Sequence, residues 1–243
     1  MGTAILACQT LRAELTLAVQ ETKRDFPIIY VESGLHNTPE LLHKKIQEEI
    51  NRIDNVDTIL LLFGYCGNSL LGIKSNKAKL VLPKVDDCIP LLLGSCETRK
   101  NISKEMGTYF LTKGWLDYEN NLLKEYERCI KRYGQNRTSK IMKIMLGHYK
   151  RFMLIDTGAY PLESVLTYTK DIAARLNLYH DVTSGSLRLF YKLLRGEWDE
   201  EFLVLEPGRA VTISDICGGS DAAQTQISQG TSMNNLSLSK NNA

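Results

Sequence analysis

The feature that most constrains the fold is a regular alternation of short apolar runs with longer amphipathic helical patterns. Apolar runs typical of β-strands lie at residues 3–8, 26–32, 57–67, 78–85, 107–115, 151–158 and 201–208. Helical patterns occupy residues 10–23, 37–53, 117–133, 139–150, 162–176 and 184–194. Because strands that alternate with helices form βαβ crossovers, the sequence predicts an α/β fold: a mostly parallel sheet with helices on both faces.

Composition divides the chain into two parts. Residues 1–217 carry the alternating pattern and are predicted to form a single α/β domain. Residues 218–243 are rich in Gly, Ser, Asn and Gln and have few large apolar side chains. Such a segment buries too little apolar surface to offset the entropy of ordering, so we expect a disordered tail.

Charge and hydropathy exclude several classes of partner. The 243-residue chain has a net charge of +2, which is too close to neutral to favour nucleic acid. The basic residues gather only at Lys131, Arg132, Arg137, Lys140 and Lys143, which we interpret as a solvated helix face. No apolar run approaches the ~20 residues that span a bilayer, so no membrane partner is expected.

The N-terminus resembles a first strand more than a signal peptide, and we therefore expect a cytoplasmic protein. In that compartment the six cysteines should stay reduced and serve as core residues, metal ligands or nucleophiles.

Three cysteines and a histidine follow the first four predicted strands. Cys8 ends the first, His36 follows the second, Cys66 the third and Cys88 the fourth. Ligands of an open parallel sheet bind beyond the carboxyl ends of its strands, so these side chains are expected at one rim. A cysteine is also a common core residue, and that interpretation stays open.

Thiolate and imidazole ligands suit Zn²⁺, and three cysteines also suit an iron–sulfur cluster with an open iron. Three protein ligands leave the open position of a catalytic zinc, whereas His36 as a fourth ligand closes the site. Asp87 is expected to orient a ligand or substrate beside Cys88. No CxxC pair or HExxH motif supports this metal site.

The segment "GYCGNSLLGIKS" resembles a phosphate loop, and an anionic or carboxylate substrate held by its backbone amides stays open as an interpretation. Gly67 permits close approach of the backbone, and Asn68 or Ser69 is expected to cap a following helix. Asn68 is also expected to orient the substrate. The spacing excludes a P-loop, because Ile73 separates Gly72 from Lys74.

Four further residues lie beside this predicted rim. Asn37, which directly follows His36, is expected to orient substrate. Trp115, Asp156 and Tyr160 are placed where they would line a pocket.

The motifs "ILACQTLRAEL", "GLHNTPELLHKKIQ", "LLLFGYCGNSLLGI", "VLPKVDDCIPLLLGS" and "GTYFLTKGW" together resemble the domain-of-unknown-function family 1638 of bacteria and archaea. The resemblance covers roughly residues 4–210. It departs at Gln9, where the family usually has Gly after the cysteine. The resemblance implies a soluble prokaryotic protein with a cysteine- and histidine-bearing site, and an association with corrinoid methyl-transfer systems, but no particular reaction.

Three functions remain open on the sequence. The first is a zinc-thiolate transferase that moves an alkyl or methyl group to a small-molecule thiol. The second is a non-catalytic module that binds or delivers a corrinoid or another metallocofactor. The third is a metal-free nucleophile at Cys66, which precedes a predicted helix.

Overall fold

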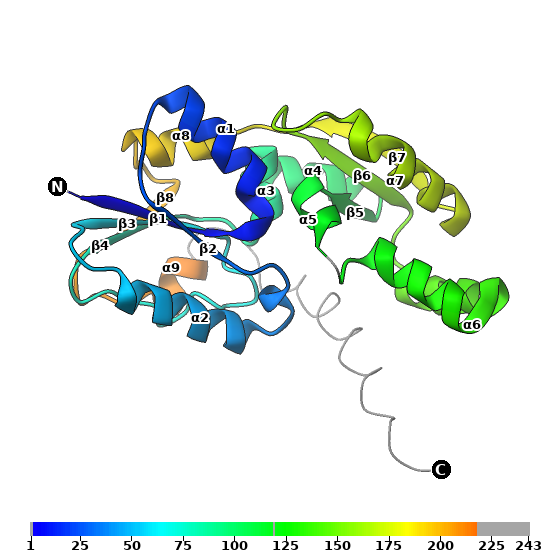
Figure 1. The fold of residues 1–243 in the computed structure, drawn as a ribbon, viewed down its shortest axis with the longest axis horizontal. Coiled ribbons are helices and arrows are strands. Elements are labelled where there is room, and N and C mark those ends of the chain that lie inside the picture. Colours follow the sequence, from blue (N-terminus) through cyan, green and yellow to red (C-terminus); the bar gives the residue numbers. More distant parts are fainter. Residues whose placement is uncertain (1, 119, 218–243) are drawn as a thin grey trace, which may run out of the picture.

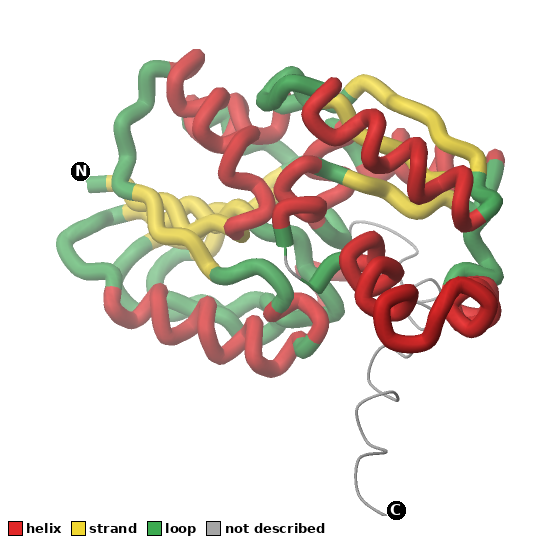
Figure 2. The backbone as a smooth tube through the Cα atoms, turned by 45° about the vertical axis from the view of Figure 1, so that its right-hand side comes forward, coloured by secondary structure: helices red, strands yellow, loops and turns green. Residues whose placement is uncertain are grey.

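The computed structural model describes residues 2–118 and 120–217, and it confirms the α/β fold with mostly parallel strands. The strands divide between two sheets, which lie beside each other in Figures 1 and 2. The sequence did not predict this division. The predicted tail, residues 218–243, lies outside the described residues.

The first sheet contains the strands that carry the predicted rim. Its order is β2-β1-β3-β4-β8, and its strands are β1 (Thr3–Cys8), β2 (Ile28–Val31), β3 (Thr58–Leu62), β4 (Lys79–Pro83) and β8 (Phe202–Leu205). The first four strands are parallel, and β8 pairs antiparallel with β4. β1 is paired on both sides. Because β1 to β4 are parallel, their carboxyl ends face one edge of the sheet.

Helices cover both faces of this sheet. In Figure 1, α1 (Arg12–Thr22) and α8 (Arg188–Arg195) lie over one face, and α2 (Pro39–Arg52) and α9 (Ile213–Cys217) over the other. Each face of the sheet has its own hydrophobic core. Alternate residues of a strand pack in one core or the other, because successive side chains point to opposite faces. Ile5 and Leu60 pack in the α1/α8 core, whereas Leu6 and Leu61 pack in the α2 core.

The second sheet is smaller and has its own core. Its order is β5-β6-β7, all parallel, with β5 (Thr108–Leu111), β6 (Arg151–Asp156) and β7 (Tyr179–Ser184). Its helices are α5 (Lys113–Asp117), α6 (Leu122–Met145) and α7 (Glu163–Leu176). Phe152 of β6 is completely buried, and Tyr126 of α6 almost so, in the core that these elements share.

Close backbone packing joins the two sheets along a seam. The Ser186 N–H donates to the Leu92 carbonyl oxygen at 2.8 Å. Gly114 of α5 lies against the carbonyl of Thr10, and a Cβ at residue 114 would come within 1.8 Å of that oxygen. The seam therefore brings the carboxyl ends of β1 and β5 together.

Several helices differ from the sequence prediction. The helices α3 (Cys88–Leu93) and α4 (Cys96–Glu105) and the strand β7 were not predicted, and β7 includes Ser184, at which a helix was expected to begin. α6 merges parts of two predicted helices across a kink at Gly134 (φ 73°), and the five predicted basic residues along it are exposed. The helix expected after Asn68 is absent, because that segment forms turns. In the described ranges, no helix is long and apolar enough to cross a membrane.

Candidate functional site

Two loops at the end of the first sheet are joined by their backbones. The Tyr65 N–H donates to the Val85 carbonyl and the Cys66 N–H to the Asp86 carbonyl, each at 2.9 Å. Gly64 permits this approach, because a Cβ there would lie 2.3 Å from the Cα of Asp87. The loop after β3 is thereby held against the loop after β4.

This pairing brings the three predicted thiols together. The thiol of Cys8, at the end of β1, lies close enough to the thiol of Cys88 to interact with it, and Cys88 interacts in the same way with the thiol of Cys66. All three side chains are half-buried free cysteines. The Sγ of Cys8 also lies 3.1 Å from the Oγ1 of Thr10. The three thiols thus form a series with Cys88 in the middle.

The thiol contacts and burial oppose ionisation. The interaction with the Cys88 thiol, and then burial, raise the pKa of Cys8 well above its usual value. The interaction with the Cys66 thiol raises the pKa of Cys88, with burial adding to that shift and the interaction with Cys8 opposing it. Without a cation nearby these two groups are therefore neutral at physiological pH.

The three thiols make pairwise contacts without forming a closed cage. In the part of the chain that the structure describes, no group of three or more His, Cys, Asp and Glu side chains is arranged to hold a metal ion. To surround one ion, the three sulfur atoms would have to shift.

The loop that carries Cys66 has an unusual backbone. Cys66, Gly67 and Asn68 all have positive φ angles, of 42°, 67° and 67°. The left-handed region costs a non-glycine residue about 1–2 kcal/mol, and such strain is concentrated at functional sites. A Cβ at Gly67 would lie 3.1 Å from the Cγ of Pro39, so the loop also lies against the start of α2. Asn68 caps no helix, because its left-handed backbone continues a turn.

The residues after β2 lie on the other side of the site. His36 packs its ring on Trp115, with the ring centroids 5.0 Å apart, and burial lowers the pKa of the imidazole. Asn37 is exposed, and its N–H donates to the Gly34 carbonyl at 3.1 Å. Ligation by His36 and substrate contact by Asn37 stay predictions.

Asp87 performs structural roles that the sequence did not predict. One carboxylate oxygen accepts the Ile89 N–H at 2.8 Å and caps α3, and the other lies 2.9 Å from an Arg99 nitrogen. Burial raises the pKa of Asp87 while Arg99 opposes that shift. Its role in orienting a ligand stays a prediction.

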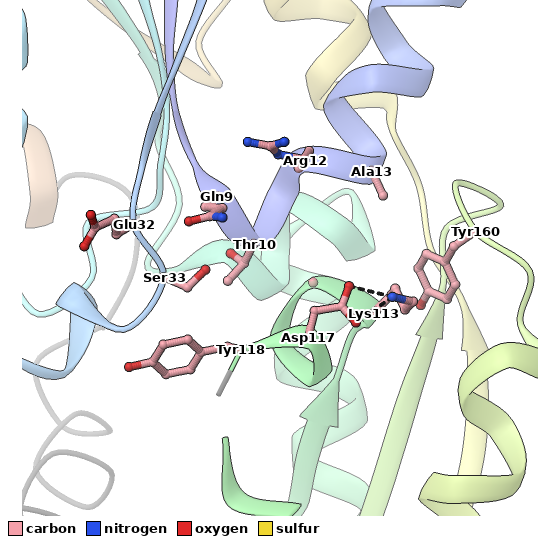
Figure 3. Close-up of a pocket in the computed structure, with 11 residues that line it drawn as sticks. Gln9, Thr10, Arg12, Ala13, Glu32, Ser33, Lys113, Asp117, Tyr118 and Tyr160 are labelled. Atoms are coloured by element: carbon pink, nitrogen blue, oxygen red, sulfur yellow. Dashed lines mark hydrogen bonds and ion pairs between the residues drawn. The ribbon is translucent and has the colours of Figure 1, made fainter. Parts of the chain in front are cut away.

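A cavity of about 530 Å³ lies along the seam between the sheets, lined in part by Thr10, the neighbour of Cys8. We call it the seam cavity. The side chains that line it include Gln9, Thr10, Arg12, Glu32, Ser33, Lys113, Asp117, Tyr118 and Tyr160. In Figure 3 the first five come from the first sheet's side and the others from the second sheet's side. These segments follow β1, β2, β5 and β6, which places the cavity at the carboxyl ends of both sheets.

The sequence identified only Tyr160 among these lining residues as a pocket residue. The strand-end rule that selected the cysteines would also have selected Arg12 and Lys113, which closely follow β1 and β5. It was applied to thiols and imidazole alone. Thr10 joins the two parts of the site, because it lines the cavity and contacts Cys8.

A buried carboxyl group lies next to the cavity. Glu14 is fully buried, and its Oε1 accepts the Thr157 hydroxyl at 3.1 Å. Its Oε2 has no hydrogen-bond partner among the described residues. Burial raises the pKa of Glu14, and its charge helps to raise the pKa of the cavity residue Tyr160.

Comparison with known proteins identifies a family whose function is not known. The model of one family, described as "Protein of unknown function (DUF1638)", matches residues 30–194, which is more than half of the chain. The matched range includes Cys66 and Cys88, whereas Cys8 and Arg12 precede it. No curated protein and no solved structure matches the chain significantly. The chain therefore belongs to the DUF1638 family of proteins of unknown function.

Proposed function

We propose that Cys8, Cys66 and Cys88 form a thiolate site for a metal ion, with Zn²⁺ as the best-suited ion, and that this site transfers an alkyl or methyl group to a small-molecule thiol. The observation that carries the proposal is the continuous series of contacts from Cys8 through Cys88 to Cys66. Three sulfur ligands leave one zinc position open for a substrate.

The two loops supply the movement that metal binding needs. Cys8 is fixed by a strand paired on both sides, whereas Cys66 lies in a left-handed turn. A shift of the Cys66 loop toward Cys8 gathers the sulfur atoms. Binding would replace the thiol protons, since only the thiolate is a metal ligand.

The transfer step follows from the chemistry of a bound thiol. A metal ion held by the three cysteines would lower the pKa of a substrate thiol that reaches it from the seam cavity, and the thiol proton would pass to solvent. The sulfur of that thiol would then attack the alkyl carbon of an activated donor, such as a sulfonium compound or an alkylated corrinoid. The new S–C bond would form as the bond from carbon to the leaving group breaks, and the leaving group would keep the electron pair.

Two other occupants use the same thiols. An iron–sulfur cluster with an open iron also needs three cysteines. If His36 supplies a fourth ligand, the zinc becomes structural and the transfer is lost.

A second candidate is a module that binds or delivers a metallocofactor without turnover. The seam cavity bears on this choice. Its volume of about 530 Å³ lies within the range of about 300–1,000 Å³ that encloses drug-sized ligands. A corrinoid is much larger, and most of it would remain outside. The cavity therefore favours a small substrate over a corrinoid cargo.

Elemental analysis of protein purified without affinity metals or chelators tests the metal site. We expect about one zinc or, in the alternative, iron per chain, with iron–sulfur absorbance separating the two. Replacement with Co²⁺ should give a thiolate-to-metal charge-transfer band, which Cys8→Ser, Cys66→Ser and Cys88→Ser each weaken.

Cys129→Ser is the matched control, because Cys129 is a buried cysteine in the core of the second sheet. It should retain the metal and the band. Protein without bound metal that also fails to take up Zn²⁺ or Co²⁺ would overturn the proposal. Metal binding without alkyl transfer to any thiol tested would favour the delivery module.

A further inference from the structure

The charged side chains of the seam cavity are not equivalent. The Nζ of Lys113 lies 2.5 Å from both carboxylate oxygens of Asp117, so these two groups neutralise each other, as Figure 3 shows. Arg12 and Glu32 have no ion-pair partner among the described residues and are exposed to solvent. The cavity thus presents one uncommitted cation and one uncommitted anion.

Arg12 is held in a position suited to binding a carboxylate. Its guanidinium carbon lies 4.4 Å from the centre of the Tyr30 ring, a stacked arrangement that leaves the N–H edge of the group open. A planar guanidinium with an open edge binds a carboxylate through two parallel hydrogen bonds.

Glu32 follows β2, the strand that neighbours β1 in the sheet, and Arg12 follows β1. The two charges therefore lie on the same side of the cavity, and Gln9 appears between them in Figure 3. Gln9, Thr10 and Ser33 add neutral hydrogen-bonding groups to this wall.

We propose that the seam cavity binds a small zwitterion of the amino-acid type. Arg12 binds its carboxylate and Glu32 binds its ammonium group. Its side chain points past Thr10 toward Cys8. The inference rests on the proposed function in one respect only, since it makes the alkyl acceptor an amino acid with a thiol side chain.

Calorimetric titration with a matched set of ligands tests the proposal. L-Homoserine is a zwitterion without a thiol, 4-hydroxybutyrate lacks its ammonium group, and 3-amino-1-propanol lacks its carboxylate. We expect L-homoserine to bind at least about tenfold more tightly than either truncated compound, since each loses a charged hydrogen bond.

Variants assign the two charges. Arg12→Gln and Glu32→Gln should each weaken L-homoserine binding at least about tenfold. Arg12→Lys should restore it only in part, because an ammonium group lacks the planar fork. Arg24→Gln, a change at an exposed arginine just beyond α1, is the matched control and should leave affinity unchanged.

Three results would overturn the inference: no binding of L-homoserine or L-homocysteine, equal binding of 4-hydroxybutyrate and L-homoserine, or unchanged affinity in Arg12→Gln. A separate binding comparison tests the proposed function. On metal-loaded protein L-homocysteine should bind more tightly than L-homoserine, and Cys8→Ser should abolish that preference while L-homoserine still binds. Zwitterion binding without a preference for the thiol would contradict the proposed alkyl transfer at the metal site, but it would still support zwitterion binding in the seam cavity.

Discussion

Gly64 lies directly against the backbone of Asp87, so that a Cβ at residue 64 would come within 2.3 Å of the Asp87 Cα. Both partners in this contact are main chain, and neither can move aside without moving its loop. Gly64→Ala should therefore separate the loops after β3 and β4 and cost about 3 kcal/mol of unfolding free energy. It should also weaken metal binding without removing any thiol. Denaturant unfolding and Co²⁺ titration measure the two effects.

Gly147→Ala provides the comparison for that variant. Gly147 follows α6, and an added Cβ would meet only carbonyl oxygens at 3.3 Å or more. Its stability should change little and its Co²⁺ titration not at all. Normal metal affinity in a folded Gly64→Ala protein would show that the contact does not position Cys66.

The left-handed backbone of Cys66 predicts an inverted order of two substitutions. At most positions alanine is better tolerated than glycine, but Cys66 has φ 42°. There Cys66→Gly should be more stable than Cys66→Ala by about 1 kcal/mol, because glycine adopts this region without strain. Both variants should lose metal binding equally. Thermal or denaturant unfolding gives the order, and a more stable alanine variant would mean that the loop is not strained.

Burial of Glu14 predicts a pH-dependent stability difference. Because burial raises the pKa of this carboxyl group, the folded protein holds its proton more tightly than the unfolded chain. Stability from this group is therefore present below the unfolded pKa and is lost as the pH rises through the folded pKa. Glu14→Gln removes that loss, so the free energy of unfolding of the variant should exceed that of the wild type by about 1 kcal/mol at pH 8.

The difference should shrink as the pH is lowered toward the pKa of a glutamate in the unfolded chain, about 4.3, since the wild-type carboxyl group then becomes neutral. Glu48→Gln, at an exposed position with a partner nitrogen 4.0 Å away, is the control and should stay within about 0.5 kcal/mol at every pH. Urea unfolding at several pH values makes the comparison. A constant gap between Glu14→Gln and the wild type would contradict the assignment.

Gly34 and Tyr118 form a coupled pair at the cavity. Gly34 has φ 91°, and a Cβ there would lie 1.8 Å from the Tyr118 hydroxyl oxygen. Gly34→Ala should cost about 2 kcal/mol or more, partly from the backbone and partly from displacement of the ring. When combined with Tyr118→Ala it should cost at least about 1 kcal/mol less than the sum of the single changes. Additive losses in this double-mutant cycle would mean that the two residues do not compete for space.

The strands other than β7, and the position of Cys8, Cys66 and Cys88 after strands that share an edge, could be predicted because both follow from local pattern and one topological rule. The apolar run predicted at residues 3–8 has the same bounds as β1. The carboxyl ends of parallel strands share one edge of the sheet. The expected helix after Asn68 was wrong for a physical reason. Asparagine caps helices and also tolerates the left-handed region, and the sequence alone does not distinguish the two uses.

The seam cavity could not be predicted, because it depends on how two sheets meet. Thr10 and Gly114 are more than 100 residues apart, and neither segment carries a local signal that the other packs against it. His36 shows the same limit. It follows β2 as expected, but its aromatic neighbour Trp115 belongs to the second sheet's side of the seam.

The pairing of β1 on both sides gives the three sulfur atoms unequal freedom. Cys8 is anchored by strands, whereas Cys66 lies in a turn and Cys88 begins the short helix α3. Metal binding should therefore change the backbone around Cys66 and Cys88 but not that of β1. Amide hydrogen–deuterium exchange should slow at residues 64–69 and 85–88 on metal binding, while the already protected amides of β1 stay as they were.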